Sequence, residues 1–384
     1  MRAIELGVRI GRLQPGPLDA ITDVRGVQVG HATRIEGDGP LVVGRGPVRT
    51  GVTVVVPHAD DPWTEPVFAG CHRLNGNGEL TGLEWVRESG LLGGVIGITN
   101  THGVGVVHDA LVAHAARERS DASAFWSLPV VGETYDGVLN DINGFHVVPG
   151  DVEAALSAAG DGPVLEGNVG GGTGMICHGF KGGIGTASRR IPAEAGGWTV
   201  GALVQANYGS RELLRVDGVP VGEAIPTSEV PSPWDQAEEL QRAGRAGPGG
   251  GSIIVVLATD APLLAHQCER LAQRASLGIG RMGGIAAHSS GDLIIAFATG
   301  NRGLSRTAGE GGTPLTVDLR MVVDRAVTPL FQAAVEATEA AIVNALLAAR
   351  TMTGRDGITA YALDADRLLD VMGRYGRGPR ARGA

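Results

Sequence analysis

The sequence predicts a protein of mixed α and β structure, with sheets that are mostly covered on both faces. Short apolar runs, many of them rich in valine, alternate along the chain with segments of helical pattern, and no internal repeat is visible. Hydrophobic residues make up 43% of the 384 residues, enough for a sizeable core in one large domain or two ordinary ones. The 62 glycines follow no collagen period, so they indicate many tight turns and close backbone approaches.

The first half of the chain alternates predicted strands with predicted helices. Apolar runs identify the strands, and Asp151 and Gly160 are the start and stop signals of the last helix in this half. In chain order the predicted elements are strands 27–36 and 51–58, helix 82–92, strand 93–101, a helix near 107–117, strand 127–137 and helix 151–160.

The second half begins with a predicted strand pair, 182–191 and 198–209, joined by a turn around AEAGG. Prolines then recur without periodicity through residues 218–251, which predicts a long loop, and such loops in compact domains are usually functional or disordered. The later predicted elements are strand 252–258, helix 261–276, strand 292–299, a long helix from Thr328, strand 357–363 and helix 364–376.

The long helix has a recognisable start and one face of mostly small residues. Thr328 is the expected N-cap, with Pro329 at the first helical position. A stripe of this kind suits close packing against a sheet or another helix. Its members are Leu330, Ala334, Ala337, Ala341 and Ala345.

Composition excludes several classes of partner. The net charge is −9, and no basic stripe appears before the tail RYGRGPRARGA, so we expect no nucleic-acid partner. No signal peptide is visible, and no run reaches the roughly 18 uninterrupted apolar residues of a membrane span, so we expect no membrane partner. Three dispersed cysteines are typical of reduced thiols. Together these features predict a cytoplasmic protein.

The stretch GPGGGSIIVVLATDAPL, residues 247–263, joins a glycine-rich loop to a dense apolar strand at Ser252. A serine hydroxyl at this point can attack the carbonyl of Gly251, convert the amide to an ester, and let water cut the chain. Ser252 then carries a free α-amine with a reference pKa of about 7.7–8.0, so a good fraction is neutral at neutral pH. That amine can act as base for the hydroxyl of its own residue. A simple turn serine before a strand is the alternative.

Five further motifs extend this observation across the chain. They are NGNGELTGLEWVRESG (75–90), GITNTHGVGVVHDAL (97–111), VVGETYDGVLNDING (130–144), GGTGMICHGFKGGIGTASR (171–189) and HSSGDLIIAFATGN (288–301). With the Gly-Ser junction, they resemble the L-aminopeptidase/D-esterase family, which includes the β-peptidyl aminopeptidases, from about residue 10 to 350. The resemblance implies an α+β fold, a four-layer αββα sandwich like that of N-terminal-nucleophile hydrolases but with different connectivity.

The resemblance also implies how the chain is divided. Self-cleavage produces an N-terminal subunit of residues 1–251 and a C-terminal subunit of residues 252–384, folded together as one domain, with the flexible loop at about 218–251. These units assemble further into homo-oligomers, such as a tetramer of αβ units.

Four residues match the catalytic positions of this family. Ser252 matches the nucleophile, and Ser290 and Asp292 match a hydroxyl and a carboxylate that help to orient and activate it. Some relatives carry Glu at the position of Asp292. The Asp292 side chain is one methylene shorter than that of Glu. Ser289 competes with Ser290 for its role, because adjacent side chains of a strand face opposite ways. Asn207 matches the side-chain donor of an oxyanion hole, whose loss typically costs about 2.7–4 kcal/mol.

Two residues match the family's substrate-binding positions. Glu133 matches a carboxylate that holds the substrate's ammonium and enforces aminopeptidase action. Tyr135 lines the same pocket or donates a hydrogen bond.

Each of these roles has a structural alternative. Asn207 or Asp292 can stabilise a turn, and Glu133 beside Asp136 can belong to a solvated turn. Tyr135 can be a core residue.

Three functions follow from these residues. The first is a hydrolase of small peptides, amides or esters with a free amine, working through an acyl-enzyme on Ser252; its candidate substrates extend to β-amino acyl groups. The second is an acyltransferase of the ornithine acetyltransferase type, which shares the architecture and self-cleavage but uses threonine as nucleophile. The third is an uncleaved binding protein on the same scaffold.

Other motifs do not lead to a cofactor or a metal. The cluster GNVGGGTG (167–174) lacks the spacing of a phosphate-binding loop, so its backbone is expected to pack under the active site or line it. No HExxH and no paired cysteines are present. The residues His102, His108 and His178 are interpreted as core or loop residues. His288 invites a Ser–His–Asp triad, but an N-terminal amine makes that histidine unnecessary. We therefore expect neither a cofactor nor a metal.

Overall fold

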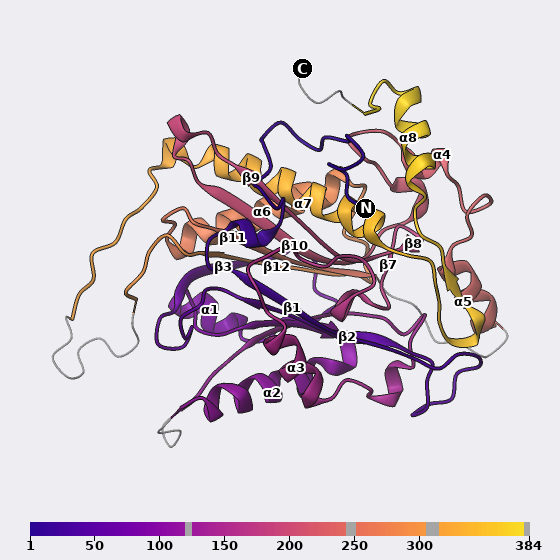
Figure 1. Ribbon diagram of the computed structural model, residues 1–384, viewed down its shortest axis with the longest axis horizontal. Helices are drawn as coiled ribbons and strands as arrows, with labels where there is room; N and C mark the ends of the chain where they lie inside the picture. The colour runs from indigo at the N-terminus through magenta and orange to yellow at the C-terminus, as the bar shows by residue number, and fades with distance from the viewer. Residues whose placement is uncertain (120–124, 243–250, 305–314, 380–384) are drawn as a thin grey trace.

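The computed structural model describes residues 1–119, 125–242, 251–304 and 315–379. Two β-sheets pack face to face in the middle of the molecule, and helices cover the outer face of each (Figure 1). This arrangement is the predicted four-layer αββα sandwich.

Six strands form the larger sheet and four form the smaller one. The larger sheet has the order β4 (Leu91–Leu92), β3 (Val67–Arg73), β12 (Gly291–Ala298), β11 (Ser252–Thr259), β10 (Thr199–Asn207), β9 (Gly183–Arg190). The smaller sheet has the order β1 (Gln28–Glu36), β2 (Val48–Val56), β5 (Ile96–Asn100), β6 (Val130–Thr134). Two short ribbons are formed by β7 (Ile176–Cys177) with β8 (Phe180–Lys181), and by β13 (Met352–Thr353) with β14 (Thr359–Ala360).

Helices complete the layers. They are α1 (Leu83–Ser89), α2 (Val104–Arg117), α3 (Pro149–Ser157), α4 (Val221–Ala224), α5 (Pro233–Arg242), α6 (Ala265–Arg281), α7 (Thr328–Ala348) and α8 (Ala365–Arg374). Helices α6 and α7 lie on the larger sheet, and α2 and α3 lie on the smaller one (Figure 1). Helix α6 connects the parallel strands β11 and β12, and α2 connects the parallel strands β5 and β6.

Strand β11 is apolar throughout because it is buried on both faces. Ile254 and Val256 belong to the core between the two sheets, whereas Ile253 and Val255 belong to the core under α6 and α7. This explains the continuous apolar run that predicted the strand.

Small residues let α7 approach the sheet closely. A Cβ atom added to Gly185 of β9 would lie 2.0 Å from the carbonyl oxygen of Ala341. The predicted stripe from Leu330 to Ala345 is fully buried, which confirms its role in close packing. The segment Asp324–Ala348 is long and apolar enough to cross a membrane, but 89% of its apolar 18-residue stretch is buried inside the protein. It is therefore a core helix of this fold.

Three sequence predictions need correction. The region 218–251 is not one loop, because α4 and α5 form within it; residues 243–250 of that prediction lie outside the described residues. Proline does not prevent α5, since Pro233 stands at its first position, where no intrahelical N–H is needed. Helix α7 has Val327, not Thr328, at its N-cap. Asp151 lies inside α3, where its carboxylate accepts the N–H of Val148 at 2.8 Å.

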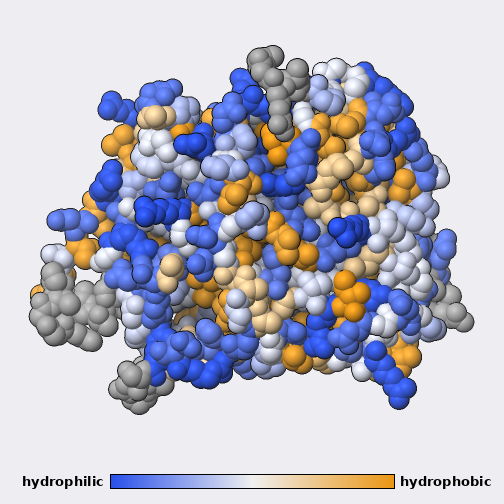
Figure 2. Space-filling model, in the orientation of Figure 1, coloured by the Kyte–Doolittle hydropathy of each residue, from blue (hydrophilic) through white to orange (hydrophobic). Residues whose placement is uncertain are grey.

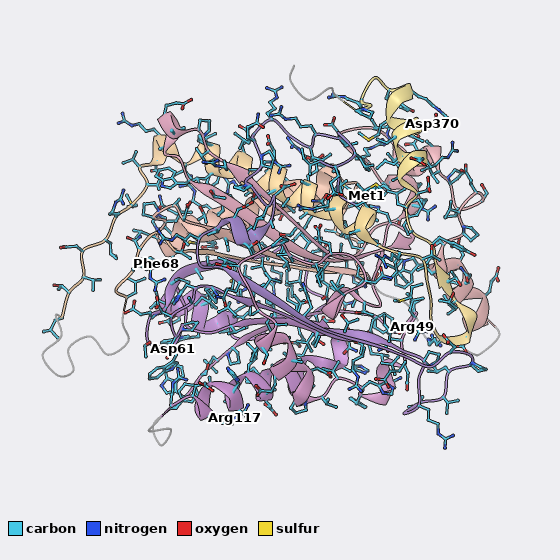
Figure 3. All side chains as sticks on the ribbon, viewed as in Figure 1. Met1, Arg49, Asp61, Phe68, Arg117 and Asp370 are labelled. Carbon is cyan, nitrogen blue, oxygen red and sulfur yellow. The ribbon has the colours of Figure 1, made fainter. Side chains whose placement is uncertain are left out.

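The N-terminus of the chain lies against one of the two outer helical layers. The N-terminus lies beside α7, where Met1 is drawn and where the N–H of Ala3 donates to Oδ1 of Asn344 at 3.0 Å (Figure 3). Arg117 marks the end of α2 on the opposite outer layer (Figure 3). Figure 2 shows a mainly hydrophilic face with hydrophobic residues in small groups.

Candidate active site

Ser252 is the first residue of β11 and lies between two neighbours at the same level of the sheet. It pairs with Asn207 at the end of the antiparallel strand β10 and with Gly291 at the start of the parallel strand β12. The residue is 4% exposed. A Cβ atom on Gly251 would lie 3.1 Å from the carbonyl oxygen of Asn207, so glycine lets the chain approach β10 closely here.

The side chain of Asn207 is held by backbone groups from two other segments. Its Oδ1 accepts the N–H of Ile176 at 2.7 Å, and its Nδ2 donates to the carbonyl oxygen of Tyr135 at 2.9 Å. The side chain is fully buried. Because Nδ2 carries two hydrogens, one remains for a further acceptor. Asn207 is therefore fixed between the sheets rather than stabilising a turn with its own amide.

Ser290 and Asp292 form a compact pair at the start of β12. The hydroxyl of Ser290 donates to Oδ1 of Asp292 at 2.5 Å. Ser290 is buried and Ser289 is exposed. Burial raises the pKa of the Asp292 carboxyl, while the Ser290 hydroxyl and the backbone N–H of Ile253 act against this shift. The carboxylate thus reaches the hydroxyl of Ser290 and the residue that follows Ser252.

The turn Asn75–Gly78 clamps this pair, and no role was predicted for its residues. Oδ1 of Asn75 accepts the N–H of Asp292 at 2.7 Å, and Nδ2 of Asn77 donates to the carbonyl oxygen of Ser289 at 2.7 Å. A Cβ atom on Gly78 would lie 3.3 Å from Cα of Gly291. The Asn-Gly-Asn-Gly sequence is the signal for a turn of this kind.

Glu133 lies on β6, on the other side of the same turn. A Cβ atom on Gly78 would lie 3.0 Å from Oε1 of Glu133. The carboxylate accepts the N–H of Glu79 at 2.9 Å and the hydroxyl of Thr101. The residue is 2% exposed, and burial raises its pKa. Gly78 thus bridges Glu133 and the strand start beside Ser252, and Glu133 is not in a solvated turn.

Tyr135 contributes its backbone to the site and its ring to a neighbouring core. Its carbonyl oxygen accepts Nδ2 of Asn207. The ring packs against the apolar cluster around Val138 and Leu139, and burial raises the pKa of its hydroxyl. A Cβ atom on Gly137 would lie 2.4 Å from this hydroxyl, so the ring turns back over Gly137.

A cavity of about 610 Å³ lies beside the junction. Gly251, Ser290 and Asp292 line it, whereas Asn207 and Glu133 are not among its lining residues. Tyr208 also lines it, and the Tyr208 hydroxyl has no hydrogen-bond partner among the described residues. Ser252 itself does not line the cavity, which therefore reaches the junction at Gly251 and at the Ser290–Asp292 pair.

Residues 19–360 match the model of peptidase family S58. The chain belongs to this family. It is 48% identical over 376 residues to the β-peptidyl aminopeptidase BapA of Sphingosinicella microcystinivorans, covering 98% of this chain and 93% of that protein. The solved structure of a Burkholderia sp. β-aminopeptidase is 53% identical, with a TM-score of 0.88, over 98% of this chain and 99% of that one.

A second solved structure adds the fold type. The L-aminopeptidase D-Ala-esterase/amidase of Ochrobactrum anthropi is described as a prototype for the serine aminopeptidases and as a new variant of the Ntn hydrolase fold. It is 45% identical, with a TM-score of 0.86, over 98% of this chain and 99% of that one. The predicted fold class is confirmed, and so is the prediction of a hydrolase of the serine aminopeptidase and esterase type.

Lys181, like the turn Asn75–Gly78, was given no role by the sequence analysis of this S58 peptidase. It is fully buried and donates only to backbone carbonyls. Burial lowers the pKa of its ammonium to about 7. The signal was available, because Lys181 is the only lysine in the sequence.

The glycine cluster and the histidines contribute structure. Gly171 and Gly172 lie between the sheets, where Cβ atoms would meet Gln205 and Ile184 within 2.4 Å. His178 is buried and its Nδ1 donates to the carbonyl oxygen of Ser210, while His288 is exposed. Within the described residues, no group of three or more His, Cys, Asp or Glu side chains is arranged to hold a metal ion.

Proposed function

We propose that this S58 peptidase cuts its own chain between Gly251 and Ser252 and then removes N-terminal residues from small peptides, amides and esters. The observation that supports this proposal most directly is the pairing of Ser252, the first residue of β11, with Asn207, the last residue of β10. A nucleophile and an oxyanion donor must share one level of the structure to act on the same carbonyl. The peptidase relatives favour hydrolysis over the acyltransferase alternative.

In maturation, the bonds that form and break belong to Gly251, Ser252 and one water molecule. The hydroxyl oxygen of Ser252 attacks the carbonyl carbon of Gly251, and the amide nitrogen of Ser252 leaves with a proton as the free amine. Water then hydrolyses the resulting ester, which gives a carboxylate on Gly251 and restores the hydroxyl of Ser252. The products are residues 1–251 and 252–384.

Turnover repeats this chemistry on a substrate. The α-amine of Ser252 takes the hydroxyl proton as the oxygen attacks the substrate carbonyl, and Nδ2 of Asn207 donates to the oxyanion. The protonated leaving amine or alcohol departs, and water hydrolyses the acyl-enzyme. Ser290 and Asp292 hold the α-amine in place.

Glu133 accounts for the requirement of a free substrate amine. Its buried carboxylate keeps lone pairs beyond the bonds from Glu79 and Thr101, so it can accept an ammonium. The names of the relatives support α- or β-aminoacyl groups as substrates. Assembly into homo-oligomers of αβ units and a cytoplasmic location stay predictions.

Intact-mass analysis of the purified wild type and of Ser252→Ala tests the proposal. We expect two fragments that meet at Gly251 and Ser252 in the wild type, and one chain in the variant. Hydrolysis of an unblocked aminoacyl p-nitroanilide should be lost in the variant, with the circular dichroism spectrum unchanged. An active wild-type chain that is still uncut would contradict the proposal.

A further inference from the structure

Lys181 stands apart from every other basic residue of the chain. It is the only lysine, and the other 31 basic residues are arginines. Its Nζ lies 2.8 Å from the carbonyl oxygen of Met175, 2.9 Å from that of Gly182 and 3.3 Å from that of Gly172. A lysine ammonium has three N–H donors, so each donor finds one carbonyl. A buried cation satisfied in this way needs an explanation beyond the packing of its stem.

A tight hairpin places Lys181 opposite Ile176. Strands β7 and β8 pair in this register, and the two turn residues, His178 and Gly179, both have positive φ values, of 49° and 69°. Positive φ at both central residues is the geometry of the type I′ hairpin turn. Arg211 fixes the turn by donating to the carbonyls of both turn residues, at 2.9 and 2.7 Å. The hairpin and Arg211 therefore fix the position of the Lys181 ammonium.

The carbonyl of Met175 connects Lys181 to Asn207. That carbonyl and the N–H of Ile176 belong to one peptide unit, and the N–H donates to Oδ1 of Asn207 at 2.7 Å. Hydrogen bonds in a chain polarise one another, and the effect is larger where the dielectric constant is low. An ammonium on the carbonyl makes the N–H a stronger donor, and this strengthens its hold on Oδ1.

We propose that Lys181 is a positioning residue for Asn207, acting through the Met175–Ile176 peptide unit to hold Nδ2 toward the oxyanion. This inference rests on the proposed function. The bond to Oδ1 decides which way the amide of Asn207 faces, because only Oδ1 can accept the N–H of Ile176. The glycine loop ending at Gly172 supplies one of the three carbonyls, which gives this loop a part in the site.

The charge of the ammonium is the active element. A neutral amine has two N–H groups and would leave one of the three carbonyls without a donor. The ionisable groups that act on Lys181 are Asp136 and Cys177, and both favour the charged form, whereas burial opposes it. A methionine at this position has a similar length and removes both the charge and the donors.

A double-mutant cycle tests the relay with Lys181→Met, Asn207→Ala and the double variant. We expect Lys181→Met to lower kcat about 10-fold, a fraction of the loss typical of a missing oxyanion donor, with KM changed less than twofold. In the Asn207→Ala background the same substitution should change kcat less than twofold. Titration of the processed Ser252 amine counts active sites, so that slow maturation does not enter kcat.

Arg189→Met is the control, because Arg189 is also a buried cation that donates to backbone carbonyls, in addition to its ion pair with Asp19, and it lies far along β9 from the junction. It should lower the melting temperature with kcat within twofold of wild type. If Lys181→Met does not fold, Lys181→Gln replaces it, since glutamine keeps a neutral donor.

The single lysine permits a direct measurement. Protein labelled with ¹⁵N at the lysine Nζ should give one lysine resonance, which should shift when an aminoacyl aldehyde forms a tetrahedral adduct on Ser252. In Asn207→Ala that shift should disappear. Equal kcat losses for Lys181→Met in both Asn207 backgrounds, or a resonance that the adduct does not move, would overturn the relay. A wild type that is uncut or inactive would instead overturn the proposed function.

Discussion

Two polar clusters flank the first residue of β11, and they differ in their access to water. Ser290 and Asp292 line a cavity of about 610 Å³. Asn207 and Lys181 are fully buried, do not line this cavity and are bonded to backbone atoms. The difference matches two requirements of catalysis. The α-amine of Ser252, which Ser290 and Asp292 hold, has to exchange protons with its surroundings, whereas an oxyanion donor acts best when it is already fixed and shielded from water.

Substitution of Asn207, in the fully buried Asn207–Lys181 cluster, should have the larger effect on kcat. Asn207→Ala removes the donor that the backbone of Ile176 and Tyr135 holds in place, so we expect kcat to fall about 100- to 1,000-fold. KM should change little, because the bond to the oxyanion exists only in the transition state. The measurement is steady-state kinetics on processed enzyme with an aminoacyl p-nitroanilide.

Maturation provides a second measurement on Asn207→Ala. The tetrahedral intermediate of self-cleavage carries the same kind of oxyanion, so self-cleavage should be slower and a fraction of the purified variant protein should still be uncut. A variant that is cut at the wild-type rate and turns over normally would remove Asn207 from the oxyanion hole.

Substitution of Asp292, in the pair that lines the cavity, should change the pH dependence of kcat/KM. Asp292→Asn keeps an acceptor for the Ser290 hydroxyl but removes the negative charge. We expect kcat/KM to fall about 100-fold, within the range typical of a displaced proton carrier. A carboxylate near an amine raises the amine's pKa, so its removal should shift the rising limb of the pH profile toward lower pH.

Asp292→Glu is the control for this change, because it keeps the charge and adds the methylene that some relatives carry. Its pH profile should resemble that of the wild type. If Asp292→Asn lowered activity without moving the rising limb, the carboxylate would not act on the α-amine of Ser252.

The sequence predicted the parts of this site that depend on local patterns. The apolar run after Ser252 predicted β11 because a strand buried on both faces needs apolar residues at every position. The burial of Lys181 was not predictable in this way, since it depends on the His178–Gly179 turn, which brings the carbonyls of Gly172, Met175 and Gly182 around one ammonium. Helix α5 was missed because the prolines at 220, 226, 231 and 233 are also typical of loops, whereas Pro233 stands at a helix start.

Glu133 allows the substrate-binding side of the site to be tested separately from the chemistry. Glu133→Gln should raise KM about 30-fold, as expected for the loss of about 2 kcal/mol from one buried charged contact. Burial raises the pKa of the Glu133 carboxyl above 4.5, so the wild-type acid limb of kcat/KM should lie above that pH. The carboxyl binds the ammonium only when ionised, so kcat/KM falls as the pH falls through its pKa.

An N-acetylated substrate is the matched control for Glu133→Gln. The wild type should strongly prefer the free amine, and the variant should lose most of that preference. Equal selectivity in both proteins would show that another group anchors the ammonium.

The smallest expected effect on catalysis comes from Ser289, the serine next to the Ser290–Asp292 pair. Ser289 is exposed while Ser290 is buried against Asp292, so Ser289→Ala should leave kcat and KM within twofold of wild type. Ser290→Ala removes the hydroxyl that donates to Asp292 at 2.5 Å and should lower kcat/KM about 10-fold, because it leaves a buried carboxylate short of one donor. The contact to Asn77 uses the backbone oxygen of Ser289, so Ser289→Ala preserves the clamp and isolates the hydroxyl. A larger loss for Ser289→Ala than for Ser290→Ala would mean that the exposed hydroxyl of Ser289 turns toward Ser252 in the processed enzyme. The cluster that lines the cavity would then be Ser289 with Asp292, and not Ser290 with Asp292.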